Sequence, residues 1–593
     1  MIYLFFLSSL VTSFLFVSPK NFHAPLQKGV SLLYLFLCIY SFWKKKYGRH
    51  GSDENLTQYL SPISIQNQKR ILPYLVGISG FCFVLASTVH AYQLTNFFAS
   101  SFLFHDADYI GISDILLSVW EGKGFESHYY SESTNGSYLH HHFAPGMFFL
   151  SPFVGLVPNR YGLAVGVFFY YQLATILWLY WAYRSKQKNN ANIPYKFLVF
   201  WVVLTNQLYL YRIGSSYHFE ILAVVSGFFF FFQWNKIKSF GSVVANKTKS
   251  HLRIQYLTFV SFGLSLLFFL SQKEDIGIYL VLFLLPQLFY ECYQGIVRKK
   301  IKSWKDLFSL QKHLSFALQI LIFGITFLYL VYVFFLYPYV TQSDSHFIWS
   351  KILTQDYHSS FKQVTSVSKS IQIFLEIIVS GGIGILQLVP ECLGIGFIYL
   401  THFFSSRPWH HEVYSYYSYS LVSFLLYSGI LWLKSEKQIS LPIVFLILSC
   451  LFWKNAMDQN FPLKTESKET WYDQRVQSEV VEDLIMANTI LNSDSHPIQS
   501  KVPSNEPIVF SQYNLAFFIT EKTKLYPLEH LPNQKEICRE TNVCYVVIAP
   551  QFTDEKLWPK KRIFDTFEGS KFLPLQKIWQ GKQVEVWKRI ETN

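Results

Sequence analysis

The chain has 593 residues, 51% of them hydrophobic, and its 58 Phe and 39 Tyr gather in blocks that carry little charge. This length and pattern exclude a small soluble domain and are typical of a multi-pass membrane protein. The net charge of +13 does not indicate nucleic-acid binding, because the segment from Lys454 onward has 18 Lys and Arg against 19 Asp and Glu, so the basic surplus lies in the apolar part.

The apolar part contains many candidate membrane spans, since a transmembrane helix needs about 20 apolar residues. The candidates are residues 2–19, 29–43, 71–95, 161–183, 197–213, 217–234, 255–271, 276–297, 314–338, 371–388, 393–404, 412–433 and 439–453. They predict a mainly α fold over residues 1–453, a polytopic transmembrane helical bundle of about 12 to 14 membrane helices. The Phe run at 228–232 is predicted to face lipid.

Short loops rich in Lys and Arg orient these spans under the positive-inside rule. Such loops occur at residues 44–50, 247–253 and 298–305 and are assigned to the cytoplasmic side. Five polar segments then fall on the outer face, namely the first outer loop (96–145), residues 272–275, the segment around Asp344 and His346, residues 407–412 and the tail after Trp453. All polar groups suited to chemistry are therefore predicted on one side.

The apolar residues 146–157 do not fit this scheme, because they are too short for an ordinary span. Counting them as a crossing would place the basic residues 184–188 outside. A half-membrane or interfacial segment restores the parity, and the sequence leaves both alternatives open.

The C-terminal residues 454–593 predict a small α/β exterior domain. Residues 479–492 have helical spacing, whereas 507–512 and 544–550 are β-branched runs bounded by turn residues. Cys538 and Cys544 can form a disulfide if this domain faces an oxidising compartment, but their spacing alone does not establish the bond.

Seven motifs occur in order along the outer face. They are Asp108, GISD (111–114), GKGF (122–125), HFAPGMFFLSP (142–152), YHFE (217–220), QKEDIG (272–277) and WHHEVYSYY (409–417). Together they resemble the bacterial membrane-protein family known as domain of unknown function 2079, which is placed among the multi-pass glycosyltransferases of the GT-C fold.

The resemblance implies a glycosyltransferase in the bacterial cytoplasmic (inner) membrane with its C-terminal domain on the periplasmic side. Its expected partners are a polyprenyl-phosphate-linked sugar, the lipid bilayer and a glycan, lipid or protein acceptor of the cell envelope. A single inverting displacement needs a base near the acceptor hydroxyl and groups that stabilise the departing phosphate.

The first outer loop supplies the expected base, with Asp108 preferred over Asp106 and Asp114. The expected substrate-binding residues are Lys273, Glu274, Asp275, His142, His218, Glu220, Arg407, His410 and His411. Lys273 is the preferred phosphate ligand, because acidic residues adjoin it. The structural alternatives are helix capping or solvation for the aspartates and snorkelling for the cations.

Histidines and carboxylates on one face also permit a divalent metal such as Mg or Mn, but no HExxH-like spacing fixes a site and no cofactor is assigned. Two other functions remain open. A transporter or flippase would place ionisable residues near the bilayer midplane in related halves, which the sequence does not show. A noncatalytic envelope membrane protein would bind a partner through its exterior domain.

Overall fold

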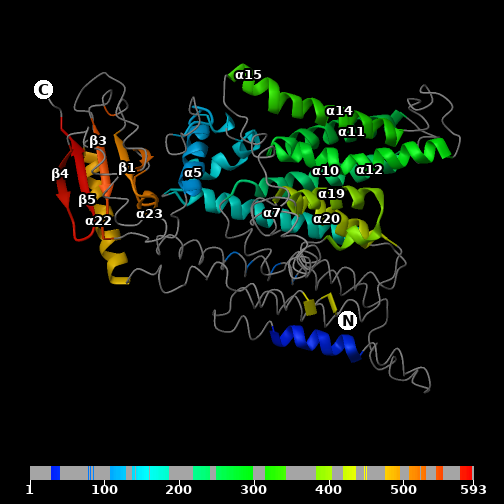
Figure 1. Cartoon of the computed structure of the whole chain (residues 1–593), viewed down its shortest axis with the longest axis horizontal. Helices are drawn as coiled ribbons and strands as arrows, with labels where there is room; N and C mark the ends of the chain where they lie inside the picture. The colour runs from blue at the N-terminus through cyan, green and yellow to red at the C-terminus, as the bar shows by residue number, and fades with distance from the viewer. Residues whose placement is uncertain are drawn as a thin grey trace. The chain divides into compact units, whose positions relative to one another are not determined.

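The computed structural model is mostly helical, with one small sheet near the C-terminus (Figure 1). It describes residues 28–40, 107–127, 137–140, 142–158, 160–185, 218–240, 249–297, 314–341, 382–403, 419–435, 474–493, 507–520, 523–528, 543–551 and 575–590, and single positions at 78, 81, 85, 88, 446, 447, 449, 450 and 538.

The chain divides into two compact units. The helical unit consists of Met1–Ala91, His142–Met147 and Val167–Gln459. The sheet unit consists of Tyr92–His141, Phe148–Gly166 and Asn460–Asn593. Most of the first outer loop is therefore in the same unit as the C-terminal segment, although more than 300 residues separate them in the sequence.

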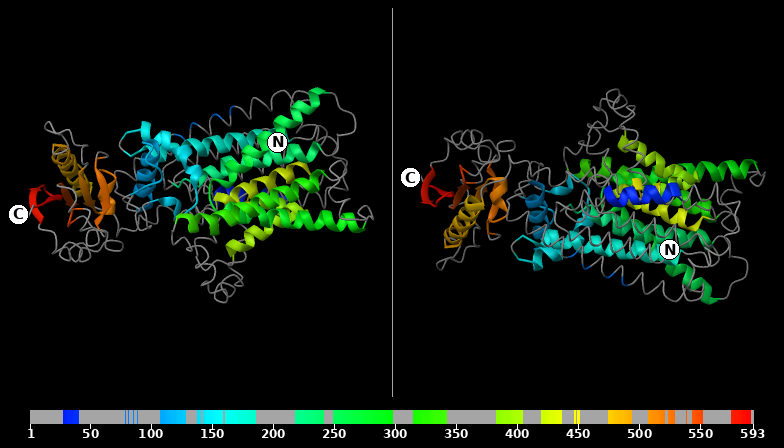
Figure 2. Two further views of the ribbon diagram at one scale, coloured as in Figure 1. Left: turned by 90° about the horizontal axis from the view of Figure 1, so that it is seen from above. Right: turned by 90° about the horizontal axis from the view of Figure 1, so that it is seen from below.

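The helical unit contains long apolar helices that run side by side (Figure 2). They are α7 (Gly162–Arg184, from Val167 onward), α10 (Ile221–Phe240), α11 (Lys249–Leu270), α12 (Asp275–Val297), α14 (Leu314–Val331), α19 (Pro390–Phe403) and α20 (Tyr419–Lys434). A π-helical turn (Tyr332–Leu336) links α14 to α15 (Tyr337–Thr341), and η5 (Gly382–Gln387) precedes α19.

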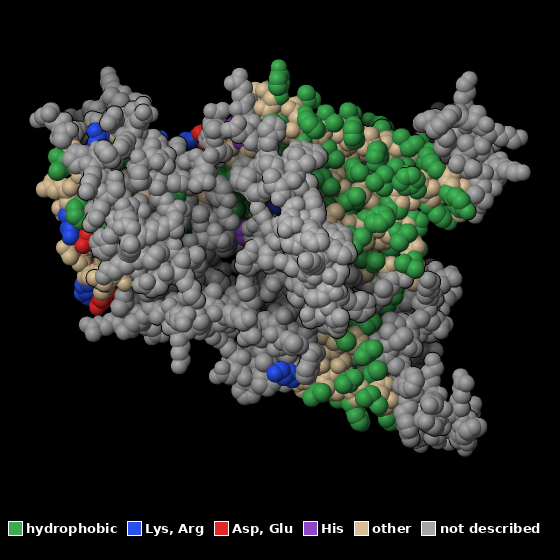
Figure 3. All heavy atoms as spheres, viewed as in Figure 1, with side chains coloured by type: hydrophobic (Ala, Val, Ile, Leu, Met, Phe, Trp, Pro, Cys, Tyr) green, Lys and Arg blue, Asp and Glu red, His purple; other side chains and the backbone are tan. Residues whose placement is uncertain are grey.

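Three helices in the described part of the chain are long and apolar enough to cross a membrane: Gly162–Arg184, Asp275–Gln294 and Phe316–Thr341. Hydrophobic side chains gather on the face of the described helices that Figure 3 shows. Leu264 in α11 and Leu328 in α14, for example, are largely exposed. Such a surface suits lipid rather than water. The larger number of spans remains a prediction.

Contacts between α7, α10 and α20 show that these three helices run in the same direction. Ser423 donates to the carbonyl of Ala223 and Lys434 donates to Asn235, so α10 and α20 are parallel. Trp178 of α7 donates to the carbonyl of Val224, and the ring of the next-turn residue Trp181 stacks on Tyr427, so α7 has the same direction. Arg184, Lys238 and Lys434 consequently share one end of the unit, the basic end.

Aromatic side chains fill the centre of the helical unit. The Phe231 ring stacks on Tyr427 with centroids 4.4 Å apart, and it also contacts Phe283 and Phe424. The prediction that the Phe run 228–232 faces lipid is therefore wrong for most of it, because Phe228, Phe230 and Phe231 are buried against neighbouring helices. A helix that is apolar all round gives no sequence signal for which face meets lipid.

The segment that contains the apolar residues 146–157 has both of its ends at one end of the helical unit. The amide of Gly146 donates to the carbonyl of Ser271, at the end opposite the basic end. The chain returns to the unit at Val167, at the start of the part of α7 that runs toward the basic end. Two short helices, η3 (Pro145–Leu150) and α6 (Ser151–Leu156), occupy the interval and expose Phe148, Phe149 and Leu156. These observations favour the interfacial alternative.

The sheet unit contains five strands in the order β2-β1-β3-β5-β4. They are β1 (Ile508–Ser511), β2 (Lys524–Pro527), β3 (Cys544–Ile548), β4 (Leu575–Gln580) and β5 (Glu585–Arg589). β1 pairs in parallel with β2 and β3, and β5 pairs antiparallel with β3 and β4. With α22 (Gln474–Ser493), this architecture confirms the helix and both strands predicted in the tail.

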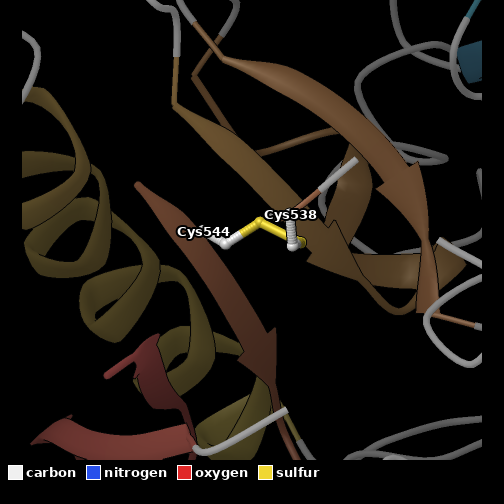
Figure 4. Close-up of a disulfide and its surroundings, with 2 residues drawn as sticks. All are labelled: Cys538 and Cys544. Atoms are coloured by element: carbon white, nitrogen blue, oxygen red, sulfur yellow. A yellow bond between two sulfur atoms is a disulfide. The ribbon is translucent and has the colours of Figure 1, made fainter. Parts of the chain in front are cut away.

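Cys538 and Cys544 form a disulfide in this unit (Figure 4), with Cα atoms 5.9 Å apart. Both residues belong to the buried cluster that Phe510 and Val546 also join. The sequence had left this bond open, and the fold supplies the distance that it needs.

Gly394 permits the close approach of α19 to α12. A Cβ atom on Gly394 would lie 2.5 Å from the carbonyl oxygen of Phe283, which is a backbone atom that cannot rotate away. We expect Gly394→Ala to destabilise the protein by about 1–3 kcal/mol through overpacking. The measurement is the thermal unfolding midpoint of the purified protein in detergent.

The matched control is Gly263→Ala in α11, where a Cβ would meet nothing within 4 Å. This change should be neutral or stabilising by up to about 1 kcal/mol, because alanine favours helix more than glycine does. Equal effects of the two substitutions would contradict the close contact at Gly394.

Candidate functional site

The first part of the candidate site is the break between α11 and α12. Five polar residues, 271–275, separate two apolar helices, and α11 ends at Leu270. The side chains of Ser271 and Gln272 donate to the carbonyl of Phe268 at 2.8 and 2.6 Å, which satisfies one of the last carbonyls of α11. Asp275 begins α12, where a carboxylate interacts favourably with the helix dipole.

A buried ion pair joins this break to α10. The Nζ atom of Lys273 lies 3.1 Å from Oε1 of Glu220, and these side chains are only 8% and 5% exposed. Glu220 directly precedes the first residue of α10. The Nδ1 atom of His218 lies 3.9 Å from the second carboxylate oxygen of Glu220. The pair thus holds two helix starts together at one end of the unit.

The end of the first outer loop lies against the same break. Nδ1 of His142 is 2.7 Å from Oε1 of Glu274. A Cβ atom on Gly146 would lie 2.4 Å from the side chain of Gln272, so the loop packs tightly there. Phe143 makes edge contacts with the rings of Tyr329, Tyr332 and Tyr337 at and beyond the end of α14. Backbone and aromatic contacts therefore fix the position of His142.

The start of α20 is the third helix start at the site. The hydroxyl group of Ser420 in α20 donates a hydrogen bond of 3.2 Å to a carboxylate oxygen of Asp275. We call His142, His218, Glu220, Lys273, Glu274 and Asp275 the polar cluster. It contains three carboxylates, one ammonium and two imidazoles at the starts of α10, α12 and α20. The positive ends of the three helix dipoles offset part of the negative charge.

Burial and charge act against each other in this cluster. Burial lowers the pKa of Lys273, but the attraction of Glu220, Asp275 and Glu274 outweighs it, so the pKa lies above its ordinary value. Burial raises the pKa of Glu274, but the nearby His142, its hydrogen bond and Lys273 more than reverse this, so the pKa lies below its ordinary value. Both groups are therefore charged at neutral pH.

Three buried side-chain oxygens, two in the break between α11 and α12 and one in Glu220, have no hydrogen-bond donor among the described residues. They are Oε2 of Glu220, Oε2 of Glu274 and Oε1 of Gln272. Buried polar atoms are rarely left unpaired in folded proteins. All three are acceptors, so the cluster is suited to a hydrogen-bond donor such as a hydroxyl group or water.

Six of the residues predicted for substrate binding thus meet in one place: His142, His218, Glu220, Lys273, Glu274 and Asp275. Arg407, His410 and His411 lie outside the described residues, as does Asp106. Asp108 lies in the first turn of α5 (Ala107–Trp120), and only its backbone is described.

Asp114 lies in the sheet unit and not in the polar cluster. Its carboxylate accepts a hydrogen bond of 3.0 Å from Ser127. Burial, with a smaller contribution from the charge of Asp114, raises the pKa of Tyr526 on β2 to about 12. The hydrogen bond to Ser127 thus ties Asp114 of α5 to the loop that follows this helix.

Sequence reasoning missed Ser420 and the aromatic contacts of Phe143. Ser420 stands in a run of alternating Tyr and Ser that carries no pairing signal. It also missed the buried hydrogen bond of 2.7 Å between Tyr279 of α12 and His402 of α19. A lone histidine in an apolar helix was the only available sign of this contact.

The residues that the structure describes contain no group of three or more His, Cys, Asp or Glu side chains arranged to hold a metal ion. His410 and His411, two of the histidines for which the sequence permitted a divalent metal, lie outside that part of the chain.

Lys273 should be essential to the stability of the polar cluster. In Lys273→Met the buried carboxylates lose their ammonium partner, and removing one member of a buried pair costs about 3–5 kcal/mol. The thermal unfolding midpoint in detergent measures this loss. The control is Lys577→Met, whose partly exposed pair with Glu585 should contribute less than about 1 kcal/mol. Equal losses would mean that the buried pair is not special.

The lowered pKa of Glu274 predicts an acid-dependent stability. Its contribution is present above the unfolded pKa of roughly 4.3 and is lost as the pH falls through the lower folded value. Glu274→Gln should therefore unfold at a lower temperature than the wild type at pH 7, and this difference should shrink under acid conditions. Glu482→Gln, at an exposed position, should show no such change. A difference that is independent of pH would contradict the prediction.

Comparison with known proteins supports the membrane assignment. Residues 112–563, about three quarters of the chain, match the family model described as predicted membrane protein (DUF2079). No curated protein matches the chain, and no solved structure does so either. The match includes all six residues of the polar cluster. The chain therefore belongs to the DUF2079 family of predicted membrane proteins.

Proposed function

We propose that the protein is a membrane glycosyltransferase of the GT-C type. It transfers a sugar from a polyprenyl-phosphate carrier to a glycan, lipid or protein acceptor of the bacterial cell envelope. The reaction takes place at the outer face of the cytoplasmic membrane and inverts the anomeric carbon. The bundle has about 12 to 14 membrane helices, and the sheet unit is periplasmic.

The polar cluster carries this proposal. Its charges gather where α11 ends and α10, α12 and α20 begin, at the end of the apolar helices opposite Arg184, Lys238 and Lys434. Basic residues mark the cytoplasmic side, so the cluster is assigned to the outer side. A site at helix ends between wet and apolar surroundings suits a substrate with a polar sugar and a lipid tail.

The cluster also discriminates among functions. A transporter typically holds its ionisable groups near the bilayer midplane on interrupted helices. Here the helices begin or end at the charged residues, and Lys273, Glu274 and Glu220 lie outside the helices themselves. This placement supports chemistry at the membrane surface over alternating access.

The proposed roles follow from charge. The unpaired acceptor oxygens of Glu220 and Glu274 bind sugar hydroxyls. Lys273 is already paired with Glu220 and surrounded by carboxylates, so it organises the cluster, and the phosphate is assigned to Arg407. A side chain of the first outer loop takes the proton of the acceptor hydroxyl, with Asp108 the first carboxylate to test.

The disulfide supports an exterior sheet unit. Disulfides such as Cys538–Cys544 persist in oxidising compartments, including the bacterial periplasm, and are rare in the cytosol. This bond agrees with the outer assignment of the tail that the basic loops give.

The test is direct. Purified protein in lipid nanodiscs, given a radiolabelled polyprenyl-phosphate sugar and envelope extract as acceptor, should release polyprenyl phosphate. If Asp108 is the base, Asp108→Asn should lose roughly 100-fold or more of this rate, because general base catalysis contributes that much. Asp53→Asn, in a predicted cytoplasmic loop, serves as the control.

Unchanged release by a folded Asp108→Asn variant would remove Asp108 from the role of base. Failure of the wild type to release polyprenyl phosphate from any donor would overturn the glycosyltransferase proposal. Movement of the intact lipid-linked sugar across the bilayer would assign the protein to transport instead.

A further inference from the structure

The polar cluster contains a pair of side chains arranged for proton transfer. Nδ1 of His142 lies 2.7 Å from Oε1 of Glu274. The Glu274 side chain is only 3% exposed, whereas the His142 side chain is 24% exposed. A buried carboxylate thus stands behind an imidazole that solvent reaches.

The carboxylate decides which imidazole nitrogen carries the proton. Burial raises the pKa of Glu274, but the hydrogen bond from His142 and the charge of Lys273 lower it, so Glu274 is ionised. An ionised carboxylate only accepts hydrogen bonds, so the Nδ1 atom of His142 must donate to it. In the neutral imidazole the lone pair then lies on Nε2, which is the nitrogen able to accept a proton.

The surrounding charge favours such an acceptor. The cluster holds three carboxylates and one ammonium, so an imidazolium at His142 brings it closer to neutrality. Glu274 would stabilise the imidazolium through the same hydrogen bond. A buried carboxylate supports the histidine of hydrolase triads in this way.

The position of His142 is also fixed. The amide of Gly146 donates to Ser271 at 2.7 Å, and the Phe143 ring packs on Tyr337 with centroids 5.0 Å apart. His142 belongs to the helical unit together with the rest of the cluster, whereas Asp108 belongs to the sheet unit. Among the described side chains of the first outer loop (109–127, 137–140 and 142–145), His142 is thus tied to the cluster by its contact with Glu274.

We infer that His142, oriented by Glu274, is the catalytic base that deprotonates the acceptor hydroxyl. This inference rests on the proposed glycosyltransferase function. The proton of the acceptor O–H moves to Nε2 of His142 as the acceptor oxygen forms a bond to the anomeric carbon. The bond from that carbon to the phosphate oxygen breaks, and its electron pair leaves with polyprenyl phosphate. The imidazolium then gives its proton to water.

The experiment measures polyprenyl phosphate release by the full chain in nanodiscs. His142→Gln should lower kcat roughly 100-fold to 10,000-fold, the usual contribution of a general base, with KM for the donor little changed. Added imidazole should restore part of the rate to His142→Ala, which a purely structural role would not permit. Glu274→Gln should give an intermediate loss, because it weakens the orientation of the ring.

His251→Gln provides the matched control, since His251 lies in the first turn of α11, at its end remote from the cluster. Release by the wild type together with a His142→Gln rate within twofold of it would overturn the base and leave the proposed function standing. No release by the wild type would overturn the proposed function and the base with it.

A second measurement covers variants that fail to fold. Diethyl pyrocarbonate modifies accessible histidines of the folded wild type, and mass spectrometry locates the modified residues. Loss of activity should follow modification of His142. Full activity with His142 modified would overturn the inference.

Discussion

The buried pair of Lys273 and Glu220 is the interaction on which the site depends. It joins the break between α11 and α12 to the start of α10, two segments more than 50 residues apart. Three carboxylates cannot share one buried volume without a cation, because desolvation and mutual repulsion both act against their charged forms. Lys273 supplies that cation, and the dipoles of three helix starts add to it.

The break between α11 and α12 also explains why the first outer loop divides. Residues 142–147 fold with the helical unit, because His142 finds Glu274 and Gly146 fits against Gln272. Most of the rest of the loop folds with the C-terminal segment, where Tyr109 donates to the carbonyl of Arg160 and packs on Phe517. One polar loop therefore serves two units, and the chain segment rich in catalytic candidates is shared between them.

The membrane assignment and the chemistry rest on different grounds. Family membership, the apolar helices and the lipid-suited surface establish a helical membrane protein. The glycosyltransferase proposal rests on a charged cluster at helix ends, in which buried acceptor oxygens have no hydrogen-bond donor among the described residues.

The sequence by itself determined the helical class and the strands at 507–512 and 544–550, and it predicted the six residues of the polar cluster among its twelve site candidates. Apolar runs and the charged breaks between them can be recognised in the local sequence, and a charged residue between two membrane helices needs a partner or water. Tertiary structure alone decided which charges pair, that Ser420 joins Asp275, that Ser127 binds Asp114 and that most of the Phe run is buried. These outcomes depend on which helix faces meet, and a helix that is apolar all round carries no local signal for that choice.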